Sequence, residues 1–243
     1  MASNSEIGHA KNVANFQDLI TVVESYGPLY NPSRTSLTLA QLIALHTTAT
    51  ASLQNVTNLK NAYDDVVNTR AAAFKQLAPL STRLVNALQA TDASKETIKD
   101  AKGYNRKIQG KRAPKKEKPL DPNQPAPRKN SANQQSFDML IQHFEGLITL
   151  LGSEPSYAPN EIDLQIATLQ ARAQDLNNKN NQEAIAAAPL SNARIERNKI
   201  LYTEKTGLVP IAFDAKKYVK SVFGANSPEY NLIKGIKFKK FKI

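Results

Sequence analysis

The sequence predicts an all-α protein made of two tandem, internally duplicated antiparallel helical-bundle repeats with long coiled-coil-like helices. Only 9 of the 243 residues are glycine, and alanine, leucine, lysine, glutamine and asparagine dominate the long segments, a composition that favours helix. Apolar residues recur at helical spacing along residues 39–77. Residues 16–110 also align with residues 144–243 with only short gaps, which indicates a duplication.

Several short matched strings support this alignment. Tyr30-Asn31-Pro32-Ser33 corresponds to Tyr157-Ala158-Pro159-Asn160, and Val85-Asn86-Ala87-Leu88 resembles Val219-Lys220-Ser221-Val222. The predicted division is a first repeat over 14–108, a linker over 109–136, and a second repeat with a basic tail over 137–243. The linker is rich in proline and charge and nearly free of large apolar side chains. We expect it to be flexible, because it cannot bury enough surface to offset the entropy of ordering.

The first repeat opens with an expected amphipathic helix over residues 16–26, which Gly27-Pro28 ends. Ser33 is then a predicted N-cap of the next helix, and Asn160 takes the same role in the second repeat. Each hydroxyl or amide oxygen there can accept a hydrogen bond from an exposed backbone N–H.

The next segment of the first repeat has a heptad-like pattern of apolar residues with three polar interruptions. Its positions are Leu39, Leu42, His46, Ala49, Leu53, Val56, Lys60, Tyr63, Val67, Arg70, Phe74 and Leu77. The pattern leaves open whether residues 36–78 form one helix or two that meet near residues 55–61. In the second repeat, the asparagine-rich run 177–181 predicts a bend or a tip. Pro189 is expected near a helix start, because proline in a helix interior costs about 3 kcal/mol.

Each repeat then continues with a helix that ends near Leu88 or Phe223. A shorter helix follows, with Ser94 or Ser227 as its predicted N-cap. The second repeat carries about ten additional residues, 203–212, which predict an extra loop between helices.

The net charge of +11 is concentrated at the C-terminal end of each repeat. Residues 95–129 and residues 194–243 each hold 12 Lys and Arg against 4 Asp and Glu. The last nine residues interleave aromatic and aliphatic side chains with lysines, which suits nucleic-acid backbones and exposed bases or an anionic membrane surface. Alternatively, the apolar side chains dock the tail onto the bundle while its lysines stay in solvent. The candidate anion-binding or nucleic-acid-binding residues are Arg106, Lys107, Lys111, Arg112, Lys115, Lys116, Lys237, Phe238, Lys239, Lys240, Phe241 and Lys242.

Several classes of protein are disfavoured by the sequence. The absence of cysteine removes disulfides, thiol catalysis and cysteine-ligated metals, and none of His9, His46 and His143 has a second histidine at a metal-binding spacing. No nucleotide-binding, hydrolase, zinc or calcium motif is present. We therefore expect no enzymatic activity, no cofactor, no metal site and no small-molecule substrate. The N-terminus lacks a secretory signal pattern and no apolar run is long enough to cross a bilayer, so the expected location is the cytoplasm.

Three strings resemble a family of uncharacterised, internally duplicated helical proteins of flavobacteria and other Bacteroidetes. They are residues 7–16 (IGHAKNVANF), 188–194 (APLSNAR) and 218–225 (YVKSVFGA). The resemblance extends over the whole chain and is least regular in the linker. It implies no activity and no catalytic residues.

The expected function is therefore that of a non-enzymatic structural or scaffold protein, with a protein partner or self-association. The alternative is a nucleic-acid-binding protein that uses the basic linker and the basic aromatic tail. An anionic membrane surface is the third expected class of partner.

Overall fold

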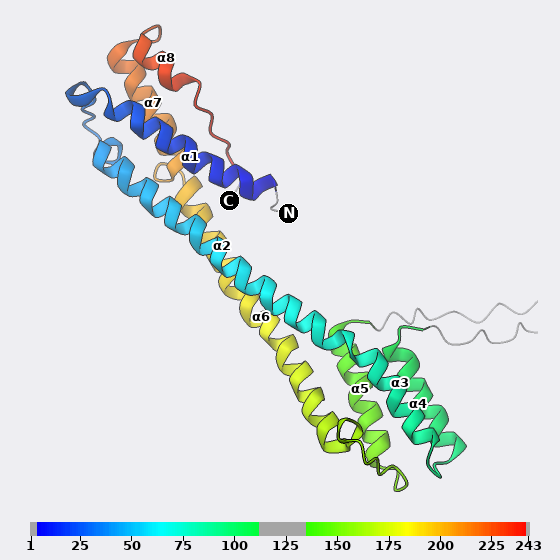
Figure 1. Ribbon diagram of the computed structural model, residues 1–243. Coiled ribbons are helices and arrows are strands. Elements are labelled where there is room, and N and C mark those ends of the chain that lie inside the picture. Colours follow the sequence, from blue (N-terminus) through cyan, green and yellow to red (C-terminus); the bar gives the residue numbers. More distant parts are fainter. Residues whose placement is uncertain (1–3, 112–134, 242–243) are drawn as a thin grey trace, which may run out of the picture. The chain divides into compact units, whose positions relative to one another are not determined.

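The computed structural model describes residues 4–111 and 135–241, and every regular element within these ranges is a helix (Figure 1). The all-α prediction is confirmed. The α-helices are α1 (Asn4–Glu24), α2 (Leu39–Lys75), α3 (Leu77–Gln89), α4 (Lys95–Ile108), α5 (Phe137–Gly152), α6 (Ile166–Tyr202), α7 (Leu208–Phe223) and α8 (Pro228–Lys234). Short 3-10 turns are η1 (Gly27–Leu29), η2 (Thr35–Leu37) and η3 (Ile162–Leu164). Within the described ranges, no helix has the length and apolar character needed to cross a membrane.

The chain divides into two compact units that each combine parts of both predicted repeats. Unit 1 comprises residues 1–63 and 186–243, and unit 2 comprises residues 64–185. Unit 1 therefore holds α1, α7 and α8 with the first part of α2 and the last part of α6. Unit 2 holds α3, α4 and α5 with the remaining parts of the two long helices.

The core of unit 1 lies between α1 and α7, with α8 packed against both (Figure 1). Phe16, Leu19 and Ile20 of α1 are almost fully buried, at the helical spacing predicted for residues 16–26. The helix begins at Asn4, however, well before the predicted start. Its added turns also bury polar residues, because they pack against the C-terminal tail of the chain.

The core of unit 2 is formed mainly by α3, α4 and α5. Phe144 and Leu147 of α5 pack with Leu84 and Leu88 of α3, and all four side chains are fully buried.

Two predicted caps are confirmed. Ser94 accepts a hydrogen bond from the backbone N–H of Thr97 at the start of α4. Ser227 accepts one from Tyr230 at the start of α8. The predicted helix ends near Leu88 and Phe223 are confirmed as well.

Residues 39–75 form one continuous helix of 37 residues, which answers the question left open by the sequence. All twelve positions of the predicted apolar pattern from Leu39 to Leu77 are buried or half-buried. His46 is half-buried on this helix, and burial lowers its pKa.

Two predictions for the second long helix are wrong. The asparagine-rich run 177–181 and Pro189 both lie inside α6, which is also 37 residues long. Asn177 donates to Glu145 (3.0 Å) and Asn180 donates to Asp138 (2.7 Å), both on α5. These bonds satisfy polar side chains that would otherwise compete with the helical backbone. Pro189 is exposed, and so is Ile185, the residue whose carbonyl has no N–H partner at the proline.

The predicted starts of the two long helices are also wrong. Ser33 and Asn160 do not cap them, because the 3-10 turns η2 and η3 intervene and the helices begin at Leu39 and Ile166. A tyrosine secures each of these connections instead. Tyr30 donates its hydroxyl hydrogen to the carbonyl of Leu37 (2.8 Å), and Tyr157 donates to that of Leu164 (3.0 Å).

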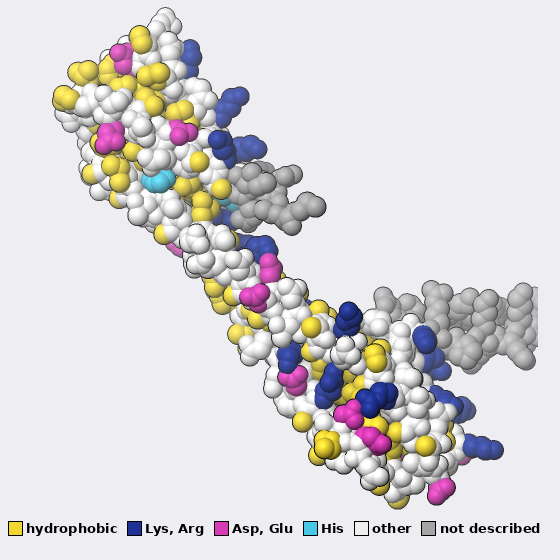
Figure 2. All heavy atoms as spheres, in the orientation of Figure 1, with side chains coloured by type: hydrophobic (Ala, Val, Ile, Leu, Met, Phe, Trp, Pro, Cys, Tyr) yellow, Lys and Arg dark blue, Asp and Glu magenta, His cyan; other side chains and the backbone are white. Residues whose placement is uncertain are grey.

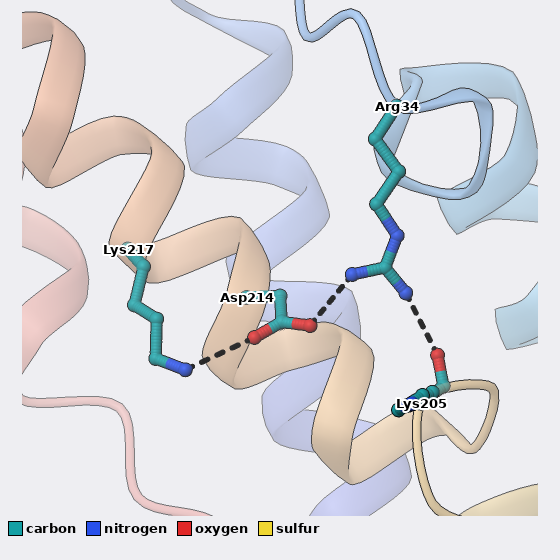
Figure 3. A network of polar contacts seen from close by, with 4 residues as sticks. All are labelled: Arg34, Lys205, Asp214 and Lys217. Carbon is teal, nitrogen blue, oxygen red and sulfur yellow. Dashed lines mark hydrogen bonds and ion pairs between the residues drawn. The ribbon is translucent and has the colours of Figure 1, made fainter.

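A polar network fastens the η2 connection to the start of α7 (Figure 3). Arg34 donates to the Asp214 carboxylate at 2.7 Å and to the backbone carbonyl of Lys205 at 2.8 Å. Lys217 donates to the other carboxylate oxygen at 3.1 Å. Burial alone would raise the pKa of Asp214, but the hydrogen bonds and charges of Arg34 and Lys217 outweigh it and hold the pKa below its ordinary value. Lys205 belongs to the predicted extra loop, of which only residues 203–207 lie outside the helices.

We expect unit 2 to lose stability at high pH through Tyr157. Burial, with the nearby charges of Glu161 and Asp163, raises the pKa of its phenol to about 12 from 10.0. Because the folded pKa is the higher one, the stabilisation is complete below pH 10 and is lost as the pH rises to about 12. Tyr157→Phe should lower the free energy of unfolding by about 1 kcal/mol at neutral pH and weaken the alkaline dependence. Urea titrations from pH 8 to pH 12 would measure both effects, and an unchanged alkaline slope would contradict the assignment.

Candidate anion-binding surfaces

One face of α4 carries a row of cationic side chains, here called the α4 basic stripe: Lys95, Lys99, Lys102 and Arg106. Their spacing of four, three and four residues places them on one side of an α-helix over about 16 Å. The opposite side of α4 is fixed in unit 2, because Ala101 and Ile108 are buried. The three lysines are exposed and Arg106 is half-buried. Figure 2 shows Lys and Arg side chains projecting along the edge of unit 2 where α4 runs.

The cations of the α4 basic stripe are unpaired with respect to the acidic side chains that the structure describes. Three of them also line an open groove of about 450 Å³, together with Gln89 and Ile98. The groove therefore combines ammonium groups with one amide and a small apolar surface.

The second basic surface lies in unit 1 and is formed by the C-terminal tail, residues 236–241. After α8 ends at Lys234, the tail runs extended beside α1 (Figure 1). Asn12 pairs with both backbone groups of one tail residue: its amide donates to the carbonyl of Lys239 (2.8 Å), and its carbonyl oxygen accepts from the Lys239 N–H (2.9 Å). Asn15 donates to the carbonyl of Lys237 (2.6 Å). Asn12 and Asn15 are only 1% and 8% exposed, so these bonds fix the tail at buried positions.

The aromatic side chains of the tail pack onto the core of unit 1. The Phe241 ring lies 4.6 Å from the His9 ring and 5.4 Å from that of Tyr202, between centroids. His9 Nδ1 and the Tyr202 hydroxyl are themselves 2.5 Å apart. Phe238 meets Phe213 of α7 edge-on at 6.0 Å. Of the two arrangements that the sequence left open, the structure has the docked one.

The predicted candidate residues are divided between these two surfaces. Lys237, Lys239 and Lys240 are exposed on the docked tail, whereas Phe238 and Phe241 are half-buried. In unit 2, the predicted cations occupy the C-terminal end of α4 and the residues after it: Arg106, Lys107 and Lys111. Arg112, Lys115, Lys116 and Lys242 lie outside the described residues. Their predicted role in anion or nucleic-acid binding stays a prediction.

Sequence reasoning missed the residues that organise both surfaces. Lys95, Lys99 and Lys102 were detectable, because their spacing with Arg106 repeats every three or four residues. Asn12 and Asn15 gave no comparable signal. Their partners lie more than 220 residues away in the sequence, and the tail backbone that they bind has no motif.

Other titratable groups in the described ranges do not assemble into a metal site, since no group of three or more His, Asp or Glu lies close enough. His143 of α5 is buried, and its Nε2 has no hydrogen-bond partner among the residues that the structure describes. Burial, with the charge of Lys107, lowers the pKa of His143, which favours the neutral ring. A groove of about 550 Å³ in unit 2 is lined by residues of mixed character that include Arg83, Ser156 and Glu161.

Comparisons with known proteins identify no relative. No protein-family model matches the chain, and neither the curated proteins nor the solved structures include a significant match.

Proposed function

We propose that the protein is a non-enzymatic interaction protein that binds an acidic protein partner through the α4 basic stripe. The observation that carries this proposal is the alignment of four cations on one face of a helix whose other face is buried. Within the part of the chain that the structure describes, these cations form no ion pair. The four positive charges repel one another because they lie close together. An acidic partner would offset this repulsion by attraction. We place this activity in the cytoplasm, since a chain without cysteine fits a reducing compartment.

A nucleic acid is the second candidate partner, in a form that differs from the sequence-based expectation. Phe238 and Phe241 contact the core of unit 1, so base stacking on them would require release of the tail. Backbone binding needs only cations, and two further exposed lysines, Lys107 and Lys111, follow the α4 basic stripe in the sequence. This arrangement favours phosphate contacts over base contacts.

We further propose that the chain arose by duplication, as its internal alignment suggests. The proposal is supported by α2 and α6, which have the same length. It is also supported by Tyr30 and Tyr157, whose hydroxyls each bond the carbonyl seven residues later. A serine caps α4 and another caps α8 at the aligned positions.

The proposed function is tested by removing the charge of the stripe without shortening its side chains greatly. The triple variant Lys95→Gln/Lys99→Gln/Lys102→Gln should bind an acidic partner about 10- to 100-fold more weakly, since each exposed ion pair contributes roughly 0.5–1 kcal/mol. The matched control is Lys11→Gln/Lys75→Gln/Lys199→Gln, which removes the same charge from three exposed lysines elsewhere. Retention would be measured by pull-down from native lysate at several salt concentrations.

Nuclease treatment and lipid vesicles separate the classes of partner in this experiment. Protein that is retained after nuclease treatment by the wild-type chain and the control variant, but not by the stripe variant, would support the acidic protein partner. Loss of all retained material on nuclease treatment would favour the nucleic acid instead. Retention on anionic vesicles alone would favour a membrane surface. Equal binding by the stripe and control variants would contradict the role of α4.

A further inference from the structure

The tail occupies a groove of unit 1 that has the features of a peptide-binding site. We infer that this groove is a receptor for an extended acidic segment of a partner protein with two aromatic side chains three residues apart. The chain's own residues 236–241 fill the groove in its absence. The partner is of the same acidic class as that proposed for α4, but the two sites share no residue.

The contacts of Asn12 and Asn15 recognise peptide backbone and not side chains. Together they satisfy the N–H and carbonyl of one residue and the carbonyl of the residue two positions earlier. An adjacent strand makes the same contacts with alternate residues of an extended peptide. Asn12 is held in place, since its amide also donates to the Tyr202 hydroxyl at 3.2 Å. Any extended segment of suitable shape can therefore make these bonds.

Three tail side chains, Ile236, Phe238 and Phe241, pack against the core of unit 1, and the last two provide the aromatic contacts. The Phe241 ring sits so close to α1 that a Cβ added at Gly8 would lie 2.6 Å from its Cζ atom. Glycine at that position thus makes room for an aromatic ring. In contrast, the side chains of Lys237, Lys239 and Lys240 are exposed. An incoming segment need not have lysine at these positions.

The charges around the groove favour a segment more acidic than the tail. Lys216 of α7 donates to the tail carbonyls of Ile236 (2.5 Å) and Lys234 (3.2 Å). Burial lowers the pKa of Lys216, which means that its positive charge is poorly compensated. The tail adds Lys240, whose ammonium lies 5.3 Å from the centroid of the Phe213 ring of α7, and the exposed Lys237 and Lys239. Carboxylates at those positions would replace repulsion by attraction.

Because the tail is covalently attached, a partner segment must exceed a minimum affinity to displace it. A tethered segment competes at an effective concentration on the order of millimolar. A free segment must therefore bind more tightly than the tail, through better charge complementarity, to displace it. The basic tail therefore competes with any incoming segment. Segments without acidic residues do not bind tightly enough to displace it.

The inference can be tested with the full-length chain and two fluorescent nine-residue peptides. One peptide has the sequence of residues 235–243, and the other has glutamate in place of each of its lysines. The variant Phe238→Ala/Phe241→Ala removes both aromatic anchors and should open the groove. We expect it to bind the acidic peptide at least tenfold more tightly than the basic one in anisotropy titrations. The wild-type chain should bind the acidic peptide at least tenfold more weakly than the variant.

Adding Gly8→Val to the open variant should abolish binding, because its side chain fills the space of the Phe241 ring. If the open variant loses helical circular dichroism, Lys239→Pro provides a second route, since it removes the N–H that donates to Asn12 and leaves both aromatic side chains in the tail. Failure of both open chains to bind either peptide would overturn the inference, as would tighter binding of the basic peptide. The Lys95→Gln/Lys99→Gln/Lys102→Gln variant should bind the peptides normally, so this result is independent of the α4 proposal.

Discussion

Cutting the chain between residues 111 and 135 is expected to leave the two fragments bound to each other. The reason is the composition of the two cores. In unit 1, Phe16 and Leu42 precede the cut while Leu201 and Val219 follow it, and all are fully buried in one cluster. Unit 2 likewise combines residues 74–108 with residues 141–176 in one core. Each buried large apolar side chain contributes roughly 1.5–3 kcal/mol, so two such cores should hold the fragments together.

The measurement needs a specific protease site introduced within residues 112–134. After complete cleavage, the fragments should elute as one species from a sizing column, with the circular dichroism of the uncut chain. The matched control is the cleaved protein in denaturant, where two separate fragments should appear. Separate, independently folded fragments in native buffer would contradict the assignment of the units. Dilution should eventually separate them, because the cut removes the effective concentration that the covalent link provides.

This composition of the units shows what local sequence patterns can and cannot predict. The apolar pattern from Leu39 to Leu77 depends only on residues three and four apart, and it correctly predicted which face of α2 is buried. Ser94 and Ser227 were predictable because a cap acts on the next few residues. Which helices share a core depends on residues far apart in the sequence, such as Phe16 and Val219 in unit 1 or Leu84 and Phe144 in unit 2. A local periodicity in the sequence carries no information about contacts between such residues.

The errors have the same physical origin. Asn12 and Asn15 look unfavourable for a packed helix until the tail backbone that they bind is present. The run 177–181 looks like a break until Asp138 and Glu145 of α5 accept from its side chains. In each case a tertiary partner outweighs a local propensity of less than about 1 kcal/mol per residue. The α4 basic stripe is different, because its spacing is local and was visible in the sequence.

Gly207→Ala is expected to be strongly destabilising, although it adds a single methyl group. Gly207 is buried between the end of α6 and the start of α7. A Cβ there would lie 2.6 Å from the backbone nitrogen of Thr203 and 2.8 Å from that of Tyr202. Its φ of −69° suits any residue, so the cost is steric and not conformational. Because backbone atoms cannot rotate away, the turn itself must move and disturb Leu201, which is fully buried.

We expect this substitution to cost about 3 kcal/mol, the upper end of the usual cost of overpacking, against the 5–15 kcal/mol that stabilises a typical domain. Gly103→Ala is the matched control, because it adds the same methyl group inside α4, where nothing beyond the helix's own local backbone lies within 4 Å of it. That change should stabilise the protein by about 0.5–1 kcal/mol, since alanine favours helix over glycine. Thermal unfolding followed by circular dichroism would measure both variants. A Gly207→Ala protein that melts at the wild-type temperature would mean that the turn between α6 and α7 is not packed as described.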